Sequence, residues 1–318
     1  MAFKQGTATR VAPDIWTIDT MFLGEPGVIA SYLLTGPHGN ALVDVGSGAS
    51  VEQLLSGIRA AGVDPVTIEH LLLTHIHLDH AGAAGILVEK LPHARVYVHA
   101  VGAPHLIDPS RLLSSAERIY GDRMAEMWGT MEPVPADRLT VINEGDVLRA
   151  GEREVQVLYT PGHAIHHVAF HDSAHAEIFS GDVAGVHLEG VDFVRPPTPP
   201  PDLNLEDWYA SIDRLQALRP QRLYLPHFGP AAHADQILRS CREMLAAWGE
   251  LMLTGMRAGE TEGELARDLA NHFDSVIARA ATRDAEEAVQ RYELATNYLM
   301  SAQGYVRYFR KHHPELLA

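Results

Sequence analysis

The sequence predicts an α/β protein whose two similar halves pack sheet to sheet as a four-layer αβ/βα sandwich, with helices appended at the C-terminal end. Two observations lead to this fold class. Short β-rich runs recur between Gly, Pro and Asn turn residues, in the order strands, helix, strands and helix in each half. From residue 231 onward only helical patterns occur. We therefore expect one domain over residues 1–230 and a helical extension over residues 231–318.

The first half is expected to open as an antiparallel sheet, because three β-rich runs follow one another with short turns between them. The sequence Gly36-Pro37-His38-Gly39-Asn40 has the composition of a hairpin turn. Ser50 is expected to cap the next helix, since apolar residues recur on one face up to Ala61. The predicted elements of this half are strands at 15–18, 28–34, 41–45 and 95–99, and helices at 50–61, 85–89 and 116–128.

The second half repeats the strand pattern before the helical extension begins. A proline-rich stretch at residues 194–202 cannot form a core helix or a central strand, so it is either a stiff connector or a wall of a pocket. In the extension, apolar residues recur at intervals of three and four. The predicted elements are strands at 139–142, 154–159, 167–170 and 176–180, and helices at 205–218, 231–256, 262–281, 285–300 and 304–312.

Composition restricts the classes of partner. The chain of 318 residues has a formal net charge of -16, and no local basic patch offsets it, so we expect no nucleic-acid partner. We see no signal-peptide pattern and no apolar run of membrane-spanning length, so a cytoplasmic protein without a membrane partner is expected. The single cysteine, Cys241, falls in a helical pattern, where its expected role is packing.

A dense group of metal-ligand side chains ends the apolar run at residues 71–73. His75, His77, Asp79 and His80 follow within a few residues, and a small-residue turn comes next. Imidazole nitrogens and carboxylates are the ligands that zinc, manganese and iron accept. His75 and His77 stand at the strand period and are expected to project from one face, while Asp79 and His80 follow the turn. The stretch predicts a metal site.

Three further strand ends each present one ligand-type side chain. His163 follows a Thr-Pro-Gly turn, Asp182 follows a Ser-Gly turn, and His227 follows Leu225-Pro226. A site between two sheets requires such ligands from separate strand ends. We expect all three to join the His-rich stretch.

The stretch Thr74-His75-Ile76-His77-Leu78-Asp79-His80 resembles the HxHxDH signature of the metallo-β-lactamase superfamily, and the elements around His163, Asp182 and His227 resemble later motifs of that family in the expected order. The resemblance implies the metallo-β-lactamase fold over roughly residues 14–230. It also implies two divalent metal ions, zinc foremost, with manganese or iron as alternatives. The implied ligands are His75, His77 and His163 for one ion, Asp79, His80 and His227 for the other, and Asp182 as a bridge.

The resemblance also implies a reaction. A water shared by two such ions has its pKa lowered from near 16 to roughly neutral, which supplies a bridging hydroxide for hydrolysis. Asp79 or Asp182 is expected to take the proton released, as a catalytic base. The two ions leave a positive pocket, so a small anionic substrate is favoured.

Two differences from known members restrict the branch of the superfamily that this sequence resembles. No cysteine stands near the second ion, unlike the lactamases with a thiolate ligand, and His77 stands where oxygen-handling diiron members carry a glutamate. The layout resembles the glyoxalase II-like and lactonase-like branches, which implies cleavage of an ester, lactone or thioester. The residues after Asp182 do not match the glutathione-binding pattern of glyoxalase II.

Other functions stay open at this point. A mononuclear iron dioxygenase acting on a persulfide would use His75, His163 and Asp182 only, and a phosphoesterase would use the same hydroxide on phosphorus. A non-enzymatic alternative is that the metals only brace the fold.

Several other residues have two interpretations. Asp44 resembles the superfamily aspartate that orients a ligand histidine, and the alternative is a turn aspartate bonded to its own backbone. His99 and His105 are expected to be non-ligands, and His167 a structural hydrogen-bonding residue. Aromatic residues after position 290 are expected in core packing, with pocket lining or the pairing of two subunits in a homodimer as the alternative.

Overall fold

Two β-sheets form the centre of the protein, which is described over residues 5–317 by a computed structural model. The first sheet has seven strands in the order β1-β2-β3-β4-β5-β6-β7. Strands β1 to β4 pair antiparallel, as expected for β2 to β4, and β4 to β7 pair parallel. The strands are β1 (Thr7–Ala12), β2 (Ile15–Asp19), β3 (Ala30–Leu34), β4 (Asn40–Val43), β5 (Ile68–Leu72), β6 (Arg95–His99) and β7 (Leu139–Ile142).

The second sheet has six strands in the order β13-β12-β11-β10-β9-β8. Its pairs are antiparallel except β11 with β12, which run parallel. The strands are β8 (Val147–Ala150), β9 (Arg153–Tyr159), β10 (Val168–Asp172), β11 (Glu177–Phe179), β12 (Arg222–Leu225) and β13 (Gly229–Ala231).

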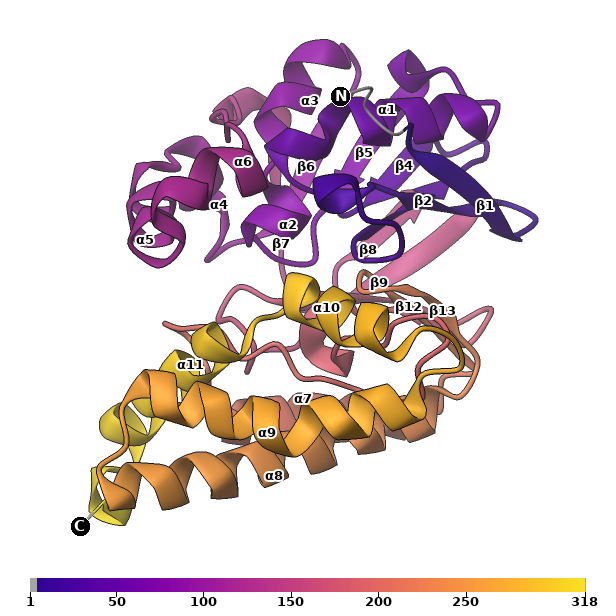
Figure 1. Ribbon diagram of the computed structural model, residues 1–318. Helices are drawn as coiled ribbons and strands as arrows, with labels where there is room; N and C mark the ends of the chain where they lie inside the picture. Colours follow the sequence, from indigo (N-terminus) through magenta and orange to yellow (C-terminus); the bar gives the residue numbers. More distant parts are fainter. Residues whose placement is uncertain (1–4, 318) are drawn as a thin grey trace.

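Helices cover the outer face of each sheet, so the molecule has four layers (Figure 1). Most of them lie in the two halves of the sandwich, and the last four form the C-terminal extension. The helices are α1 (Val51–Ala60), α2 (Leu78–Ala81), α3 (Ala84–Lys90), α4 (Ala103–Ile107), α5 (Ser110–Tyr120), α6 (Met124–Trp128), α7 (Leu205–Ala217), α8 (Ala234–Ala258), α9 (Glu262–Ala280), α10 (Ala285–Ala295) and α11 (Tyr298–His312). The predicted αβ/βα sandwich with appended helices is confirmed.

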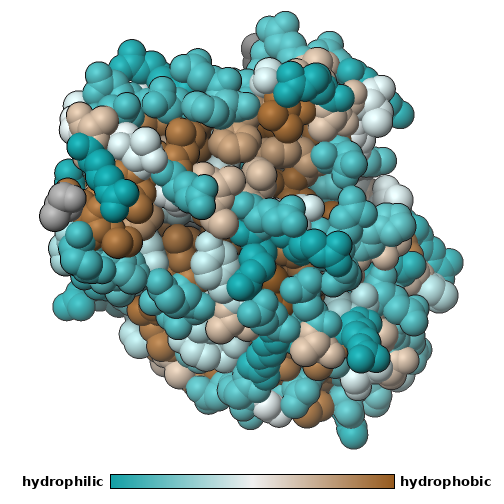
Figure 2. Space-filling view, turned by 90° about the horizontal axis from the view of Figure 1, so that it is seen from below, coloured by the Kyte–Doolittle hydropathy of each residue, from teal (hydrophilic) through white to brown (hydrophobic). Residues whose placement is uncertain are grey.

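Four apolar clusters occur among the described residues, and three of them hold these layers together. One packs α1 and α3 on the first sheet, and another packs α7, α8, α9 and α11 on the second. The third lies between the sheets and includes Tyr32, Phe170 and Tyr224. Because side chains alternate along a strand, each sheet feeds two clusters at once. The face of the C-terminal helices is largely hydrophilic, with scattered hydrophobic patches (Figure 2).

Some local predictions are wrong. Ser50 precedes α1 but its side chain makes no capping bond to the helix and instead lies 3.1 Å from the Ser47 hydroxyl, Oγ to Oγ. The helix expected at 116–128 is two helices, interrupted at Gly121, whose φ of 51° is not helical. The helix expected at 285–300 ends at Ala295, because Thr296 and Asn297 are extended and the Asn297 side chain caps α11.

Three strands were not predicted. These are β1, β8 and β13, which lie at sheet edges; β1 and β8 are largely exposed or half-buried, so they lack the continuous apolar run of a buried strand. Among the described residues, no helix is long and apolar enough to span a bilayer.

Candidate metal centre

The His-rich motif follows β5 and leads into α2. Strand β5 ends at Leu72, so His75 and His77 lie in an irregular segment beyond it. The expectation that the strand period directs these two side chains is therefore wrong. Asp79 and His80 lie in α2, a single helical turn.

The remaining candidate ligands follow β9, β11 and β12. His163 comes after Gly162, whose φ is 130° and where a Cβ would lie 2.3 Å from the Cα of Trp208. Asp182 comes after Gly181, whose φ is 54° and where a Cβ would lie 2.4 Å from Nε2 of His167. Only glycine fits at either position without a shift of its neighbours. These glycines let the chain turn sharply at the strand ends that deliver the two ligand-type side chains.

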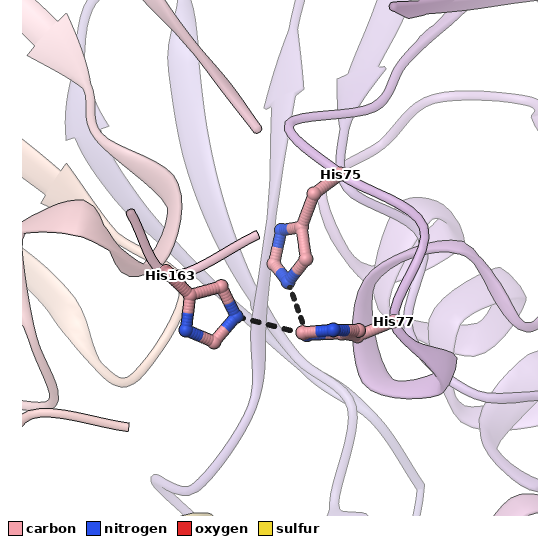
Figure 3. A group of neighbouring side chains, drawn as sticks. All are labelled: His75, His77 and His163. Atoms are coloured by element: carbon pink, nitrogen blue, oxygen red, sulfur yellow. Dashed lines mark hydrogen bonds between the residues drawn. The ribbon is translucent and has the colours of Figure 1, made fainter. Parts of the chain in front are cut away.

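Three histidines face one another in the first group. The Nδ1 atom of His77 lies 3.0 Å from Nε2 of His75 and 2.8 Å from Nε2 of His163 (Figure 3). The three nitrogens lie within 4.8 Å of one another. Two of these residues come from the first half of the sandwich and His163 comes from the second, so the group forms only when the halves pack together.

Asp79, His80 and His227 form a second group. The Oδ2 atom of Asp79 lies 3.5 Å from Nε2 of His80 and 3.3 Å from Nε2 of His227. The backbone contact from His187 N to the His227 carbonyl, at 2.7 Å, holds the loop that carries this last histidine. This group also joins the two halves.

Asp182 lies between the two groups. Its Oδ2 atom is 3.4 Å from Nε2 of His163 and 3.9 Å from Nε2 of His75. Its Oδ1 atom is 3.4 Å from Nε2 of His80 and 3.6 Å from Nε2 of His227. One carboxylate oxygen therefore faces each group.

The outer nitrogens of four histidines make hydrogen bonds that set their tautomers. Nδ1 of His163 donates to the Pro197 carbonyl at 2.7 Å, and Nδ1 of His227 donates to the Val28 carbonyl at 2.9 Å. Nδ1 of His80 lies 2.9 Å from Asp44 Oδ2, and Nδ1 of His75 lies 3.0 Å from the Thr74 hydroxyl. In the neutral form of each ring, a proton on Nδ1 leaves the lone pair on Nε2, the atom that points into the site.

Asp44 orients His80 and is not occupied with its own backbone. The residue is 3% exposed, and its carboxylate accepts from the Thr74 backbone N–H at 2.8 Å and lies within 3.0 Å of the Thr74 hydroxyl. The same carboxylate holds His80. Of the two interpretations of Asp44, the structure agrees with the one that resembles the superfamily.

Burial and neighbouring charges shift the pKa values of the site histidines in different directions. Burial, with neighbouring histidines adding to it, lowers the pKa of His75 well below its usual value, and burial lowers the pKa of His163 to about 3. Burial would also lower the pKa of His80, but the charges of Asp79, Asp182 and Asp44 outweigh it and raise that pKa well above the usual value. Neutral imidazoles are ready ligands, whereas His80 must release a proton before it binds a metal.

The two carboxylates are ionised. Burial would raise the pKa of Asp79, but His80 and His227 outweigh it and hold that pKa well below the usual range. The pKa of Asp182 is lowered in the same way by His80, His163 and His227 against the opposing effect of burial. Both groups are therefore available as anionic ligands.

The other histidines singled out in the sequence lie outside these groups. Nδ1 of His167 lies 2.8 Å from the Thr160 hydroxyl, and Nε2 accepts from the Asp182 backbone N–H at 3.0 Å, so both ring nitrogens are used structurally, as expected. His99 stacks on Tyr159. Cys241 is buried in the cluster under the second sheet, which agrees with its expected packing role.

Sequence reasoning missed the groups that hold the histidines from behind. The Val28 and Pro197 carbonyls belong to loops whose backbone positions no pattern specifies. Pro197 lies in the proline-rich stretch, which proves to be part of the surroundings of the site. The sequence also contains no indication that Tyr120 of α5 lies near the site. Burial and the charge of Asp79 raise the pKa of Tyr120, and its hydroxyl lies 3.4 Å from the Met300 sulfur in α11.

Comparison with known proteins agrees with this geometry. Residues 24–227 match the family model described as the Metallo-beta-lactamase superfamily. The chain belongs to this superfamily. It is an enzyme, and its relatives named as thioesterases and hydroxyacylglutathione hydrolases are hydrolases.

Named relatives and one solved structure give a finer view. The chain is 26% identical over 207 residues to the metallo-beta-lactamase fold-containing protein ST1585 of Sulfurisphaera tokodaii (64% of this chain, 74% of that protein). It is 30% identical over 204 residues to the acyl-coenzyme A thioesterase MBLAC2 of Gallus gallus (59% and 66%). It is 27% identical over 124 residues to a hydroxyacylglutathione hydrolase of Aeromonas salmonicida (39% and 36%). The structure of the metallo-beta-lactamase family protein TTHA1429 from Thermus thermophilus shares the fold, with a TM-score of 0.69 at 21% identity over 95% of each chain.

Proposed function

We propose that the protein is a dinuclear metal-dependent hydrolase that cleaves a thioester, within the wider class of esters and lactones. The observation that carries the proposal is the position of Asp182, which turns one carboxylate oxygen to each of two groups of candidate ligands. A carboxylate in this position is suited to bridge two ions. Each group supplies three further donors: His75, His77 and His163 on one side, and Asp79, His80 and His227 on the other.

The residues present fit two divalent cations. Nε2 of His80 and Oδ1 of Asp182 are buried and find no hydrogen-bond partner in the described part of the chain. Buried polar atoms of native proteins are normally satisfied, so these two unsatisfied atoms, 3.4 Å apart, support the proposal that a cation binds between them. Imidazole and carboxylate donors favour zinc, with manganese and iron as the alternatives.

Two ions held in this way supply Lewis acidity toward the substrate carbonyl and lower the pKa of a water molecule to near neutrality. The chain supplies orientation and proton transfer. The Asp79 side chain is 17% exposed, whereas that of Asp182 is 4% exposed. Asp79 is thus the carboxylate that solvent reaches, and it is the better placed of the two to accept a proton and pass it outward.

The thioester preference within this class rests on the relatives. One is named an acyl-coenzyme A thioesterase, another an ACP thioesterase, and others hydroxyacylglutathione hydrolases. Each of these names describes the hydrolysis of a thioester. A thiolate-ligand lactamase is disfavoured, because Cys241 lies 3.7 Å from the Val183 carbonyl and burial raises the pKa of its thiol.

The test is metal analysis combined with a substrate screen. We expect about two zinc ions per chain and hydrolysis of acyl thioesters, and we expect Asp182→Ala to lose most of both. The screen includes a lactone, a phosphodiester and, under oxygen, a glutathione persulfide. Wild-type protein with one iron per chain and oxygen uptake on the persulfide would overturn the proposal in favour of the dioxygenase.

A further inference from the structure

The connecting segment, residues 185–202, reaches the loops of three candidate ligands. It begins just after Asp182, and its Pro197 carbonyl accepts the hydrogen bond from His163 Nδ1. Its His187 exchanges backbone hydrogen bonds with the loop of His227: His187 N donates to the His227 carbonyl at 2.7 Å, and Phe228 N donates to the His187 carbonyl at 3.2 Å. Apart from isolated bridges, this segment contains no strand or helix. Its shape therefore depends on other parts of the chain.

The C-terminal helices hold the connecting segment through Arg195. Its side chain is 0% exposed, and its Nη2 atom lies 2.9 Å from Oε2 of Glu293 in α10. The guanidinium carbon lies 3.5 Å from the ring centre of Tyr298 in α11 and 5.7 Å from that of Trp248 in α8. Three helices of the extension thus meet on one side chain of the segment.

The backbone of the segment is held by the same helices. The Tyr292 hydroxyl donates to the Phe193 carbonyl at 2.6 Å and accepts from the Leu188 N–H at 3.3 Å. In α11, a Cβ at Gly304 would lie 1.9 Å from the Thr198 carbonyl oxygen, so the helix approaches the segment as closely as only glycine permits. Thr198 directly follows Pro197, the residue that holds His163.

Helix α10 also reaches the first half of the sandwich. Arg291 donates through Nη2 to the Gly27 carbonyl at 2.7 Å, and Leu294 and Ala295 pack against the cluster under the first sheet. Gly27 is next to Val28, whose carbonyl holds His227. Figure 1 shows α10 between the two halves of the molecule. The C-terminal helices therefore contact the backbone beside Pro197, which holds His163, and the backbone beside Val28, which holds His227.

Arg195 depends strongly on Glu293. Nε and Nη1 of Arg195 are buried without hydrogen-bond partners in the described residues, and Glu293 is the one carboxylate within ion-pair distance there. Removing the Glu293 charge leaves a buried cation with no counter-charge, which proteins rarely tolerate without rearrangement. The side chain that would move is two residues from Pro197.

We propose that Arg195 and Glu293 are positioning residues of the metal centre, through which the C-terminal helices fix the orientation of His163 by way of the Pro197 carbonyl. The inference rests on the proposed function, since it assumes that His163 binds a metal. It assigns the helical extension a role in metal binding that its sequence does not indicate.

The experiment compares Glu293→Gln with Glu287→Gln, which removes the same charge from an exposed position on the same helix. Three properties are measured on full-length protein: the zinc dissociation constant by chelator competition, the electronic absorption spectrum of the cobalt(II)-substituted protein, and the thermal unfolding of the metal-free protein. We expect Glu293→Gln to bind zinc about 10- to 100-fold more weakly and to change the cobalt spectrum, because supporting residues of metal ligands have effects of this size. Glu287→Gln is expected to match the wild type in all three.

A purely structural role for Glu293 would lower the unfolding temperature alone. Glu293→Gln protein with wild-type zinc affinity and cobalt spectrum would therefore overturn the proposal while the proposed function stands. Wild-type protein that binds no metal would overturn both. If Glu293→Gln does not fold, Tyr292→Phe decides, since it removes the two hydroxyl contacts to the connecting segment and leaves the Arg195–Glu293 ion pair in place.

Discussion

Replacing Asp44 by the nearly isosteric asparagine tests whether the hydrogen bond from His80 to Asp44 contributes to metal binding. Asp44 has a φ of 53°, a left-handed backbone conformation that asparagine adopts more readily than most residues, so the backbone should not shift. The carboxylate accepts hydrogen bonds through both oxygens: Oδ1 from the Thr74 N–H and Oδ2 from His80 Nδ1. Asparagine has one oxygen and one amino group, so either orientation sets a donor against a donor.

The consequence for metal binding follows from the tautomer of His80. If the amide nitrogen faces the imidazole, the proton moves from Nδ1 to Nε2, which is the atom that faces Asp79 and Asp182. If it faces Thr74, a buried N–H loses its acceptor instead. Supporting residues of this kind typically contribute 10- to 100-fold in metal affinity, so we expect Asp44→Asn to weaken binding by about 1.4–2.7 kcal/mol.

The assay is a zinc titration against a competing chelator near neutral pH, with Asp137→Asn as the control. Asp137 is exposed, and its replacement alters the net charge by the same amount. The control should bind zinc as the wild type does. Asp44→Asn protein with unchanged zinc affinity would refute the reasoning, because it would show that the hydrogen bond to His80 does not govern metal binding.

Three further predictions concern ligation and stability. His227→Ala removes one donor of the second group and should reduce the zinc content to about one ion per chain, measured by atomic emission; two ions retained would argue against its role as a ligand. Trp208→Phe loses the 2.8 Å hydrogen bond from the buried indole to the Val183 carbonyl and should lower the free energy of unfolding by about 1–3 kcal/mol in urea denaturation, whereas an unchanged midpoint would contradict this. Burial would raise the pKa of Asp14, but its hydrogen bonds and charge interaction with Arg153 lower it overall, so its stabilising effect is present above its usual pKa and is lost as the pH falls through the lowered one. Asp14→Asn should therefore lower the free energy of unfolding at pH 7, and the difference from the wild type should shrink as the pH falls through the lowered pKa of Asp14; a difference independent of pH would refute this assignment.

Much of the fold could be predicted because its signals are local. The β-rich runs at β2, β3, β6, β9 and β11 and the periodic helices α8 and α9 were found near their observed positions. Edge strands such as β1 and β8 have one partner and half-exposed faces, so their composition differs little from that of loops. The break between α10 and α11 depends on the Asn297 cap. It was not predicted because the apolar periodicity continues across this position.

The candidate ligands could be named from the sequence, but their geometry could not. The motif from His75 to His80 and the three later strand ends identify which side chains can bind a metal. Their convergence depends on sheet packing, and their tautomers depend on carbonyls such as that of Pro197, whose position is set by helices far along the chain. The assignment of each ligand to one ion remains a prediction, as does the division of the chain at residue 230.

The most direct test of the central claim is anomalous diffraction from crystals of the zinc-loaded protein at the zinc absorption edge. We expect two zinc positions, one bound by His75, His77 and His163 and the other by Asp79, His80 and His227, at about 2.0–2.2 Å from the ligand atoms. Asp182 should bind both ions, one through each oxygen. A single zinc position, or zinc bound elsewhere while these side chains remain free, would contradict the proposal.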